Sequence, residues 1–545
     1  MNRRTLYPAI LSLLLITQSL FAASNKLPYK PFPPAWQATL DLMTVPQAGS
    51  TEGWVPGAVV VIKSPEFGVR VGTVGYADIE KKKRMHPDLH FRVGSVTKSF
   101  TAQVVLTLEQ EGKLKLTDPI TKYLGDDPIV MAIPNVELLT IGEALQMNTG
   151  IANYLDNKKI SMSPQVTPDK HYTPDDLMYV LDKNYVPASE RLTPTFDPPT
   201  ASYPNPYWKL LNPTAPAPPN FAWWDYSNSN YILLGMIIEK ITHVPIHELM
   251  KRDIFDKLGL RDTYFATDET VPPDMIRGYT LWNANYSKKI YDKWHDITNI
   301  NATYAWTAGA IISTPWDILK YVDTIFRTNK LLDPGTKEKW LTFVSADIHW
   351  PGMEYGAGGL MQGHRVYGDL RGHGGAYPGY KTLMYYFFDS DTTFVLCTNT
   401  MDQVSDYMAP EVMILDSIMP LVKSAVTTPK PANRGKAPVH DGSVRLAWQA
   451  GRVYGTNYDV FVGTDADRVE RATPESHDGV EMMTTMTPSI SYKTRSANKK
   501  YYWRVDTITA GQPLQITTET PISPFVAAIP PTVNGPVWSF TTAGK

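Results

Sequence analysis

Several features that mark other classes of protein are scarce in this sequence. Its 545 residues include one cysteine, Cys397, so no disulfide can form within the chain. Lys and Arg number 52 against 54 Asp and Glu, and a net charge of -2 excludes the basic field that holds nucleic acid. The 11 His residues are scattered without the spacing of metal ligands, so neither a metal nor another cofactor is indicated. The chain must be stabilised by its own core, in which we expect Cys397 to be a buried small apolar side chain.

Long hydrophobic runs are also missing, except at the N-terminus. Arg3 and Arg4 precede the largely apolar stretch 6–21, and the small residues 22–24 follow it, which is the pattern of a secretory signal peptide. The apolar stretch is shorter than the ~20 residues of a spanning helix, although an uncleaved membrane anchor is the alternative. We therefore expect residues 1–23 to be removed, leaving a periplasmic or secreted protein with no stable membrane span.

The length of the chain predicts at least two domains, because it exceeds one ordinary core. Residues 24–423 form the larger unit, and the polar, proline-rich segment 424–442 is typical of an interdomain linker. Residues 443–545 contain short alternating strands between turn signals, which predicts an antiparallel β-sandwich. The strands are 444–448, 457–463, 501–506 and 537–542. They resemble a fibronectin type III-like module, which would be an attachment or spacer domain, or only a packing unit.

The larger unit is predicted to be an α/β domain. Strands are expected at 58–63, 69–75, 381–388 and 392–397, and helices at 95–111, 230–239 and 408–421. Strands at both ends with helices between fit a sheet completed by its two termini and flanked by helices, with an inserted all-α region. The proline- and aromatic-rich stretch 155–222 is too long for an ordinary loop and is predicted to form a lid or wall over the active site.

The first of the predicted helices begins with Ser95-Val96-Thr97-Lys98. Residues three apart lie on the same face of a helix, so the Lys98 amine can reach the Ser95 hydroxyl. Burial can lower the pKa of Lys98 until the amine accepts the hydroxyl proton, which would make Ser95 a nucleophile. Ser496 and Lys499 repeat the spacing, but they belong to a turn before a strand.

A second motif, Tyr226-Ser227-Asn228, precedes the next apolar helix. Tyr226 could relay a proton to the leaving group, and Asn228 could hold a substrate carbonyl. The triplet Tyr203-Pro204-Asn205 matches the same short pattern, but no helix follows it.

A third motif, His373-Gly374-Gly375, is predicted to stand just before an edge strand. Its two glycines let the backbone approach a ligand closely. The backbone N–H groups of Ser95 and Ala376 would then form an oxyanion hole.

These motifs carry a resemblance to a known family. The stretches 91–124, 226–265 and 372–386 resemble the superfamily of serine-type D-alanyl-D-alanine carboxypeptidases and class C β-lactamases, which also contains esterases and D-amino-acid peptidases. The resemblance implies a β-lactamase/transpeptidase-like sheet over residues 30–422. It also implies that catalytic-motif positions are taken by Ser95, Lys98, Tyr226, Asn228 and His373. Trp306 matches an aromatic residue that lines the cleft of the family, or it packs in the core.

The chain departs from the carboxypeptidases of this group at the residues that hold the substrate's free carboxylate. Their arginine position falls on Leu360, and their hydroxyl positions fall on Gly374 and Ala376. Arg365 or Arg371 would have to substitute. A buried carboxylate without a partner is costly, so a substrate that lacks this group fits better.

We therefore expect a hydrolase that forms an acyl-enzyme on Ser95 and acts on a small molecule or peptide. The expected bond is an ester, an amide or a D-amino-acid peptide bond, and a D-Ala-D-Ala carboxypeptidase-like role in cell-wall peptide metabolism is nearly as well supported as an esterase. A β-lactamase is the next alternative. A non-catalytic penicillin- or peptide-binding wall protein is the alternative from another class.

Overall fold

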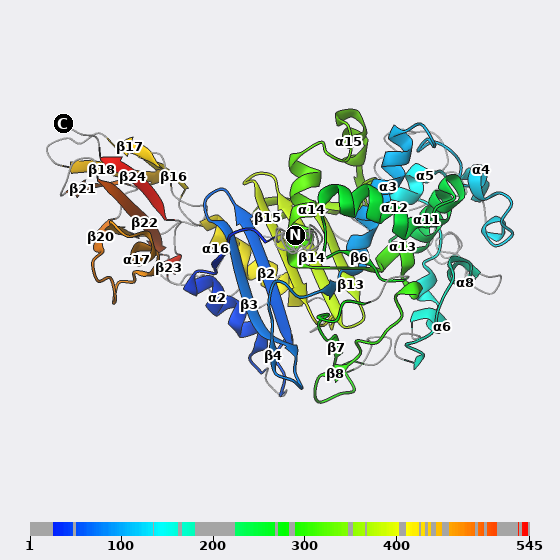
Figure 1. Cartoon of the computed structure of the whole chain (residues 1–545), viewed down its shortest axis with the longest axis horizontal. Coiled ribbons are helices and arrows are strands. Elements are labelled where there is room, and N and C mark those ends of the chain that lie inside the picture. The colour runs from blue at the N-terminus through cyan, green and yellow to red at the C-terminus, as the bar shows by residue number, and fades with distance from the viewer. Residues whose placement is uncertain are drawn as a thin grey trace, which may run out of the picture.

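The chain forms a large mixed α/β domain with a smaller β unit beside it (Figure 1). The computed structural model describes residues 26–46, 51–133, 136–161, 166–179, 224–267, 271–282, 289–346, 353–365, 368–402, 410–424, 427–430, 434–437, 443–449, 457–485, 489–494, 499–508, 532–533 and 537–542. The predicted signal peptide at 1–23 lies outside these residues, and so do most of the predicted lid, the triplet at 203–205 and Ser496.

A mixed sheet forms the centre of the large domain. In spatial order its strands are β1 (Lys30–Pro31), β3 (Gly68–Asp78), β2 (Gly57–Ser64), β15 (Thr392–Thr398), β14 (Tyr380–Phe387), β13 (Gly368–Tyr377), β12 (Leu360–Arg365), β11 (Met353–Gly356) and β10 (Phe343–Ser345), and β4 (Lys83–Arg84) pairs with β3. β1 is parallel to β3, and the pairs from β3 across to β10 are antiparallel. Val61 lies opposite Val395, so strands from the two ends of the domain complete the sheet, as predicted.

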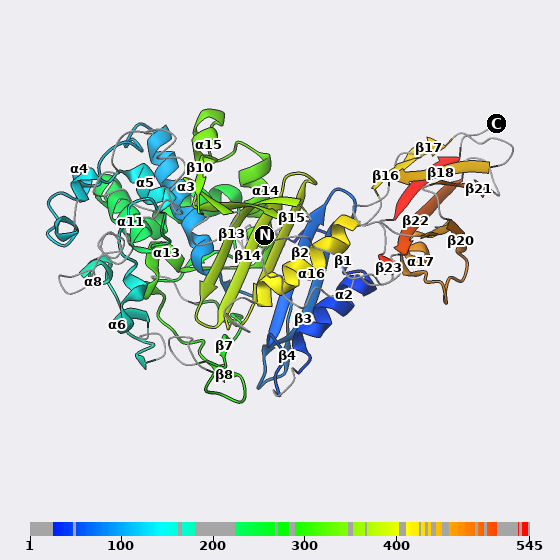
Figure 2. The same cartoon turned by 180° about the vertical axis from the view of Figure 1, so that it is seen from behind.

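Helices cover both faces of this sheet. α2 (Pro34–Asp41) and α16 (Pro410–Ser424) lie on one face, and α14 (Pro315–Arg327) lies on the other (Figure 2). Successive residues of a strand point to opposite faces, so Leu396 joins the core under α2 and α16 whereas Cys397 joins the core under α14. The prediction that Cys397 is buried is confirmed, and burial raises the pKa of its thiol to about 12.

The chain between β4 and β10 forms a mainly helical region. Besides α14, its described α-helices are α3 (Thr97–Gln110), α4 (Thr121–Leu124), α5 (Ile141–Gln146), α6 (Lys158–Ser161), α8 (Pro174–Tyr179), α11 (Ser229–Thr242), α12 (Ile246–Met250), α13 (Trp306–Gly309) and α15 (Pro334–Trp340). Its shorter helical segments are η2 (Gly94–Val96), η3 (Val130–Ala132), η4 (Val136–Leu138), η5 (Tyr154–Asp156), the π-helix η6 (Lys251–Asp256) and η7 (Ala302–Tyr304), whereas η1 (Leu42–Thr44) follows α2 earlier in the chain. Small sheets of β5 (Phe91–Arg92), β9 (Ile311–Ser313) and β6 (Tyr264–Phe265), and of β7 (Tyr279–Thr280) and β8 (His295–Asp296), interrupt it. The insertion is therefore not entirely helical. The sequence did not predict these strands, because strands this short leave no alternating pattern.

Helix α3, which begins two residues after the predicted nucleophile, is largely buried. Phe100, Val104 and Leu108 lie on one face and are buried, as their spacing predicts. Phe100 stacks on Tyr321 of α14 with 3.9 Å between ring centroids. Gly112, in the left-handed region at φ 71°, follows the end of the helix. Packing on several sides fixes α3 relative to the central sheet.

The predicted position of His373-Gly374-Gly375 before an edge strand is wrong. The triplet lies within β13, an interior strand between β14 and β12, and His373 is opposite Met384. Glycines carry no side chain to show the alternation of a strand, so the sequence pattern concealed β13, although its neighbour β14 was predicted.

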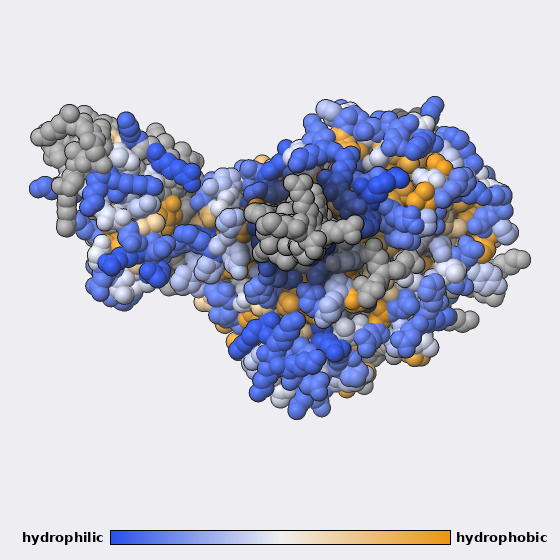
Figure 3. All heavy atoms as spheres, viewed as in Figure 1, coloured by the Kyte–Doolittle hydropathy of each residue, from blue (hydrophilic) through white to orange (hydrophobic). Residues whose placement is uncertain are grey.

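The surface of the protein is more hydrophilic than these cores. None of the described helices is long and apolar enough to cross a bilayer. On the face shown in Figure 3, hydrophilic residues predominate and hydrophobic ones gather in small separate areas.

The described strands after residue 424 form two sheets. One contains β16 (Thr427–Lys430), β18 (Ser443–Gln449) and β21 (Ser489–Lys493), and the other contains β17 (Gly435–Ala437), β24 (Trp538–Thr542), β22 (Lys500–Ile508), β19 (Asn457–Gly463), β20 (Glu481–Thr485) and β23 (Thr532–Val533). Leu446 and Tyr492 of the first sheet share a buried cluster with Val460 and Trp503 of the second. This common core confirms the predicted C-terminal β-sandwich.

The predicted linker at 424–442 contains strands and is a partial error. β16 pairs with β18, and β17 runs parallel to β24. Both lie at sheet edges, where a proline such as Pro429 is tolerated because no further strand needs its missing N–H. Part of the proline-rich composition therefore belongs to the edges of the sandwich.

The β-sandwich contacts the edge of the central sheet through α17 (Ala466–Arg471). Glu470 forms ion pairs with Lys30 of β1 and with Arg70 of β3. Arg70 is largely buried, so its pair with Glu470 is better shielded from water than a surface pair.

A buried arginine supports this helix from within the sandwich. Arg504 donates to the carbonyl oxygens of Val469, Glu470 and Ala472 at the C-terminal end of α17. It also makes a two-point contact with Asp506, with Nε–Oδ1 and Nη2–Oδ2 distances of 2.7 Å. Both side chains of this pair are 2% exposed. Arg504 therefore satisfies helix-end carbonyls that the helix itself cannot.

We expect Arg504→Ala to destabilise the sandwich by about 3–5 kcal/mol, because Asp506 and the carbonyls of α17 lose their buried partner. Adding Asp506→Leu should recover part of the loss by removing the unpaired charge. Hydrogen exchange of β19 and β22 in the full chain measures both effects. Unchanged protection in Arg504→Ala would contradict this account.

Candidate active site

Ser95 and Lys98 lie one turn apart where η2 passes into α3. The distance from Lys98 Nζ to Ser95 Oγ is 2.9 Å. Ser95 is partly exposed, whereas Lys98 is completely buried. The spacing that predicted this contact is therefore realised as a hydrogen bond.

The surroundings of Lys98 favour its uncharged form. Its Nζ lies 2.6 Å from Oδ1 of Asn228 and 2.8 Å from the carbonyl oxygen of Ala308. Burial lowers the pKa of Lys98 well below its ordinary value. A neutral amine has two N–H bonds and one lone pair, and both of these oxygens can only accept. With its hydrogens on Asn228 and Ala308, the lone pair of Lys98 faces the Ser95 hydroxyl.

The second motif brings a phenol to the same place. Tyr226 precedes α11, and Lys98 Nζ lies 5.0 Å from the centre of its ring. Burial raises the pKa of Tyr226, an effect that its hydrogen bond with Ser95 partly offsets. The phenol therefore stays protonated at neutral pH beside both the nucleophile and the amine.

His373 is completely buried, and protein groups occupy both of its ring nitrogens. Its Nδ1 donates to the carbonyl of Gly374, so in the neutral ring Nε2 accepts from the Tyr355 hydroxyl at 3.1 Å. Burial first, and then the positive charge of Lys98 whenever that amine is protonated, lower the pKa of His373 to about 3, although the Gly374 carbonyl acts in the opposite direction. These contacts do not support a proton-transfer role for His373. They indicate instead that His373 holds the backbone of Gly374 in place.

The glycines of β13 let its backbone touch the start of α3. A Cβ atom on Gly375 would lie 1.8 Å from the carbonyl oxygen of Val93 and 3.2 Å from the nitrogen of Ser95. A Cβ atom on Gly94, whose φ is +52°, would lie 2.8 Å from the nitrogen of Ala376. The nitrogens of Ser95 and Ala376 thus belong to two backbone segments in direct contact, which is the arrangement that an oxyanion hole needs.

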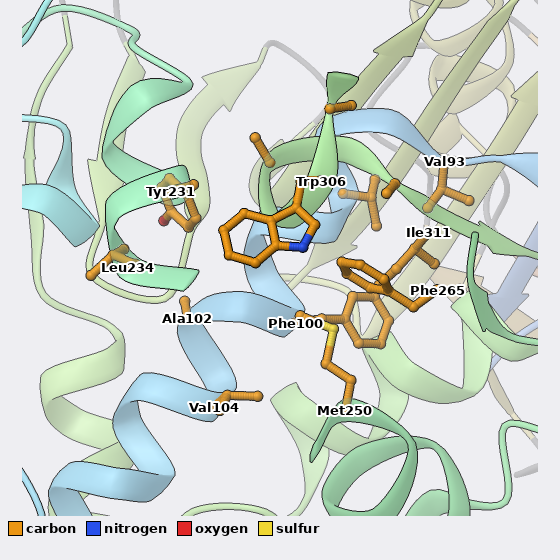
Figure 4. Close-up of a cluster of buried hydrophobic side chains, with 14 of the residues drawn as sticks. Val93, Phe100, Ala102, Val104, Tyr231, Leu234, Met250, Phe265, Trp306 and Ile311 are labelled. Carbon is orange, nitrogen blue, oxygen red and sulfur yellow. The ribbon is translucent and has the colours of Figure 1, made fainter. Parts of the chain in front are cut away.

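Trp306 belongs to the hydrophobic core, the alternative that the sequence left open. Its indole lies among Ala102 of α3 and Tyr231 and Leu234 of α11 (Figure 4). A Cβ atom on Gly235 would meet the ring at 2.6 Å, so the indole packs against the backbone of α11. The ring therefore anchors α13, the helix that carries the Ala308 carbonyl.

The substitutes considered for a carboxylate-binding arginine are not brought to this site. Leu360 is completely buried in the core. Arg371 donates from Nε to Gln362 at 2.5 Å, and its guanidinium lies 4.6 Å from the ring centre of Phe388. The side chain of Arg365 is outside the described residues.

Some residues of this site escaped the sequence analysis. Tyr355 contacts His373, Asn153 contacts Asn228, and Ala308 contributes only its carbonyl. A backbone carbonyl leaves no residue-type signal. Asn153 does show one, since its side chain caps η5, but its distant partner cannot be read from the sequence.

Within the part of the chain that the structure describes, no group of three or more His, Cys, Asp or Glu side chains could hold a metal ion. The large domain has the fold of the β-lactamase/transpeptidase-like serine hydrolases. The profile described as Beta-lactamase matches residues 42–415, and the chain therefore belongs to the beta-lactamase family.

Similar proteins have several activities. Penicillin-binding protein 4* of Bacillus subtilis (strain 168) is 22% identical over 60% of this chain, and the match spans 64% of that protein, which is less than two thirds. The structure of a D-stereospecific amidohydrolase from Streptomyces sp. is 25% identical with a TM-score of 0.55, over 71% of this chain and 98% of that one. The D-amino acid amidase from Ochrobactrum anthropi SV3, complexed with D-phenylalanine, shares the fold with 23% identity and a TM-score of 0.56, over 71% and 97% of the two chains.

The glycine contacts give a matched pair of variants. Gly375→Ala should slow labelling of Ser95 by a fluorophosphonate about 100-fold or more, because the new methyl group would push β13 away from the start of α3. Gly374→Ala should change the rate less than about threefold, because the nearest neighbour of its Cβ would be the flexible Leu383 side chain, at 3.3 Å. The second-order rate of labelling measures both. Equal losses in the two variants would contradict the assigned geometry.

Proposed function

We propose that this protein is an exported hydrolase that forms an acyl-enzyme on Ser95. The observation that carries the proposal is the buried Lys98 amine, 2.9 Å from the Ser95 hydroxyl, with acceptors for its own hydrogens at Asn228 and Ala308. An amine held in this way can take the hydroxyl proton as the oxygen attacks.

In the first half of the reaction, Ser95 Oγ bonds to the substrate carbonyl carbon and its proton passes to Lys98. The N–H groups of Ser95 and Ala376 stabilise the negative charge on the carbonyl oxygen. When the tetrahedral species collapses, the bond to the leaving amine or alcohol breaks, and that group takes a proton through Tyr226 and Lys98. The product of this half is an ester on Ser95.

Water completes the reaction in the second half. It attacks the ester carbonyl and gives its proton to Lys98, directly or through Tyr226. The bond between the carbonyl carbon and Ser95 Oγ then breaks as the proton passes to that oxygen. His373 positions the Gly374 backbone, and Asn228 serves both Lys98 and the substrate.

The substrate we favour is an amide or ester of a D-amino acid, or a short peptide with such a bond. The completely buried Leu360 at the position of the carboxylate-binding arginine supports a substrate without a free carboxylate at that point. The similarity to a D-stereospecific amidohydrolase supports the D-configuration. D-Ala-D-Ala carboxypeptidase and β-lactamase activities remain the alternatives within the class.

Other parts of the proposal rest on the sequence. The N-terminal pattern at 1–23 supports export to the periplasm or medium. We retain the domain assignment of 24–423 and 443–545, with the linker shortened by the strands found within it. The fibronectin type III-like character of the β-sandwich, and the closer resemblance to class C β-lactamases, also belong to the proposal.

Covalent labelling tests whether the protein is an enzyme. We expect a fluorescent fluorophosphonate to label the wild type and to leave Ser95→Ala unlabelled, because the variant has no nucleophile at this position. Ser99→Ala, four residues further along α3, should label like the wild type. If the wild type fails to label where a related hydrolase does, a non-catalytic wall-binding protein becomes the better reading.

A substrate panel tests the choice within the class. D-Phenylalanine amide and p-nitrophenyl acetate should be turned over with a kcat/KM at least about tenfold above that of a D-Ala-D-Ala peptide, because the peptide must desolvate its carboxylate without a matching cation. The L-amide and nitrocefin are the comparison substrates. Cleavage of the D-Ala-D-Ala peptide alone would contradict the argument from Leu360.

A further inference from the structure

The segment before η5 contacts the start of α11 through the side chain of Asn153. Its Oδ1 accepts from the backbone nitrogens of Asn228 and Leu155, each at 3.3 Å, and from Nδ2 of Asn228 at 3.2 Å. A backbone N–H can only donate, so the acceptor in Asn153 must be its amide oxygen. The side chain of Asn153 therefore has one permitted orientation.

The orientation of the Asn153 side chain determines that of the Asn228 side-chain amide. Because Oδ1 of Asn153 can only accept, the NH₂ group of Asn228 must face it. The oxygen of Asn228 then faces Lys98 Nζ at 2.6 Å. Were the Asn228 amide turned over, its NH₂ group would meet the amine, and the lone pair of Lys98 would be drawn away from Ser95.

We propose that Asn153 is a positioning residue that fixes the Asn228 amide and thereby directs the lone pair of Lys98 to Ser95. The inference rests on the proposed roles of Ser95 and Lys98 and adds the group that holds the base in its reactive orientation. Asn153 acts only through Asn228.

Neighbouring contacts hold the two segments together. Tyr154 N donates to Ser229 Oγ at 3.0 Å, and Ser229 Oγ donates to the carbonyl of Ala152 at 2.7 Å. Thr149 Oγ1 donates to Asn230 Oδ1 at 2.5 Å. Ser229 thus joins the same two segments as Asn153 without touching the Asn228 amide, which makes it the matched control.

The titratable groups that face Lys98 are phenols and an imidazole. Nζ lies 5.0 Å from the ring centre of Tyr226 and 5.7 Å from that of Tyr231, both from the α11 side. His373 faces it from β13 and is held neutral by burial. Helix α13 contributes the uncharged Ala308 carbonyl. Because these groups are uncharged, a carboxylate introduced at position 153 would be the main new charge that affects the pKa of Lys98.

The test compares Asn153→Leu, Asn153→Asp and Ser229→Ala in the full chain. The pH profile of kcat/KM for p-nitrophenyl acetate is the readout, because its acid limb reports the deprotonation of Lys98. Asn153→Leu should lower kcat/KM by about 10- to 100-fold at every pH, since the Asn228 amide loses its fixed partner. Asn153→Asp keeps the acceptor and should retain activity within about threefold at alkaline pH, with the acid limb about one unit higher, because its charge favours the ammonium form.

Ser229→Ala should lower the melting temperature and leave the acid limb in place. An acid limb in Asn153→Asp that coincides with the wild type would overturn the proposal, and so would an equal displacement in Ser229→Ala. If Asn153→Leu fails to fold, the comparison of the other two variants still decides. Failure of the proposed function is a separate result, in which the wild type shows no activity that depends on Ser95.

Discussion

The structure depends on the burial of one amine. Lys98 is completely buried near the start of α3, and an ammonium ion there would need acceptors for all its hydrogens and compensation for its lost hydration. The two carbonyl oxygens within reach, from Asn228 and Ala308, match the two hydrogens of a neutral amine. The lone pair of the amine is then left to face the Ser95 hydroxyl. Burial thus produces the base.

The elements around the amine are arranged to keep it there. α11 supplies an amide and α13 supplies a carbonyl, and the core holds both, since the indole of Trp306 fixes α13 against Gly235. The central sheet supplies the other half of the site through Gly375, which lets β13 approach the backbone before α3. A side chain at that glycine would separate the nucleophile from the strand beside it. In the proposed mechanism, the helical region therefore prepares the base, and the sheet supplies the backbone donors.

Much of this could be read from the sequence where the information is local. The spacing of Ser95 and Lys98, the apolar face of α3 and the apolar run in β15 can each be recognised within a few residues. Contacts between distant residues could not be read in this way. Asn153 and Asn228 are separated by 75 positions, and nothing in either segment points to the other. The interior position of His373 was missed because glycine-rich strands conceal their own pattern, and the edge strands of the sandwich were missed because proline is typical of linkers.

The same burial bears on substrate choice. It lowers the pKa of Lys98 and of His373 and raises that of Tyr226, so each of these groups is driven toward its uncharged form. Leu360, at the position where the resemblance implies a carboxylate-binding arginine, is buried in the core and supplies no cation. Charge then develops at the site mainly on the carbonyl oxygen during attack, where backbone N–H groups can stabilise it. A neutral ester or amide enters such a site without the desolvation that a carboxylate requires, and its binding leaves the proton balance of the amine undisturbed.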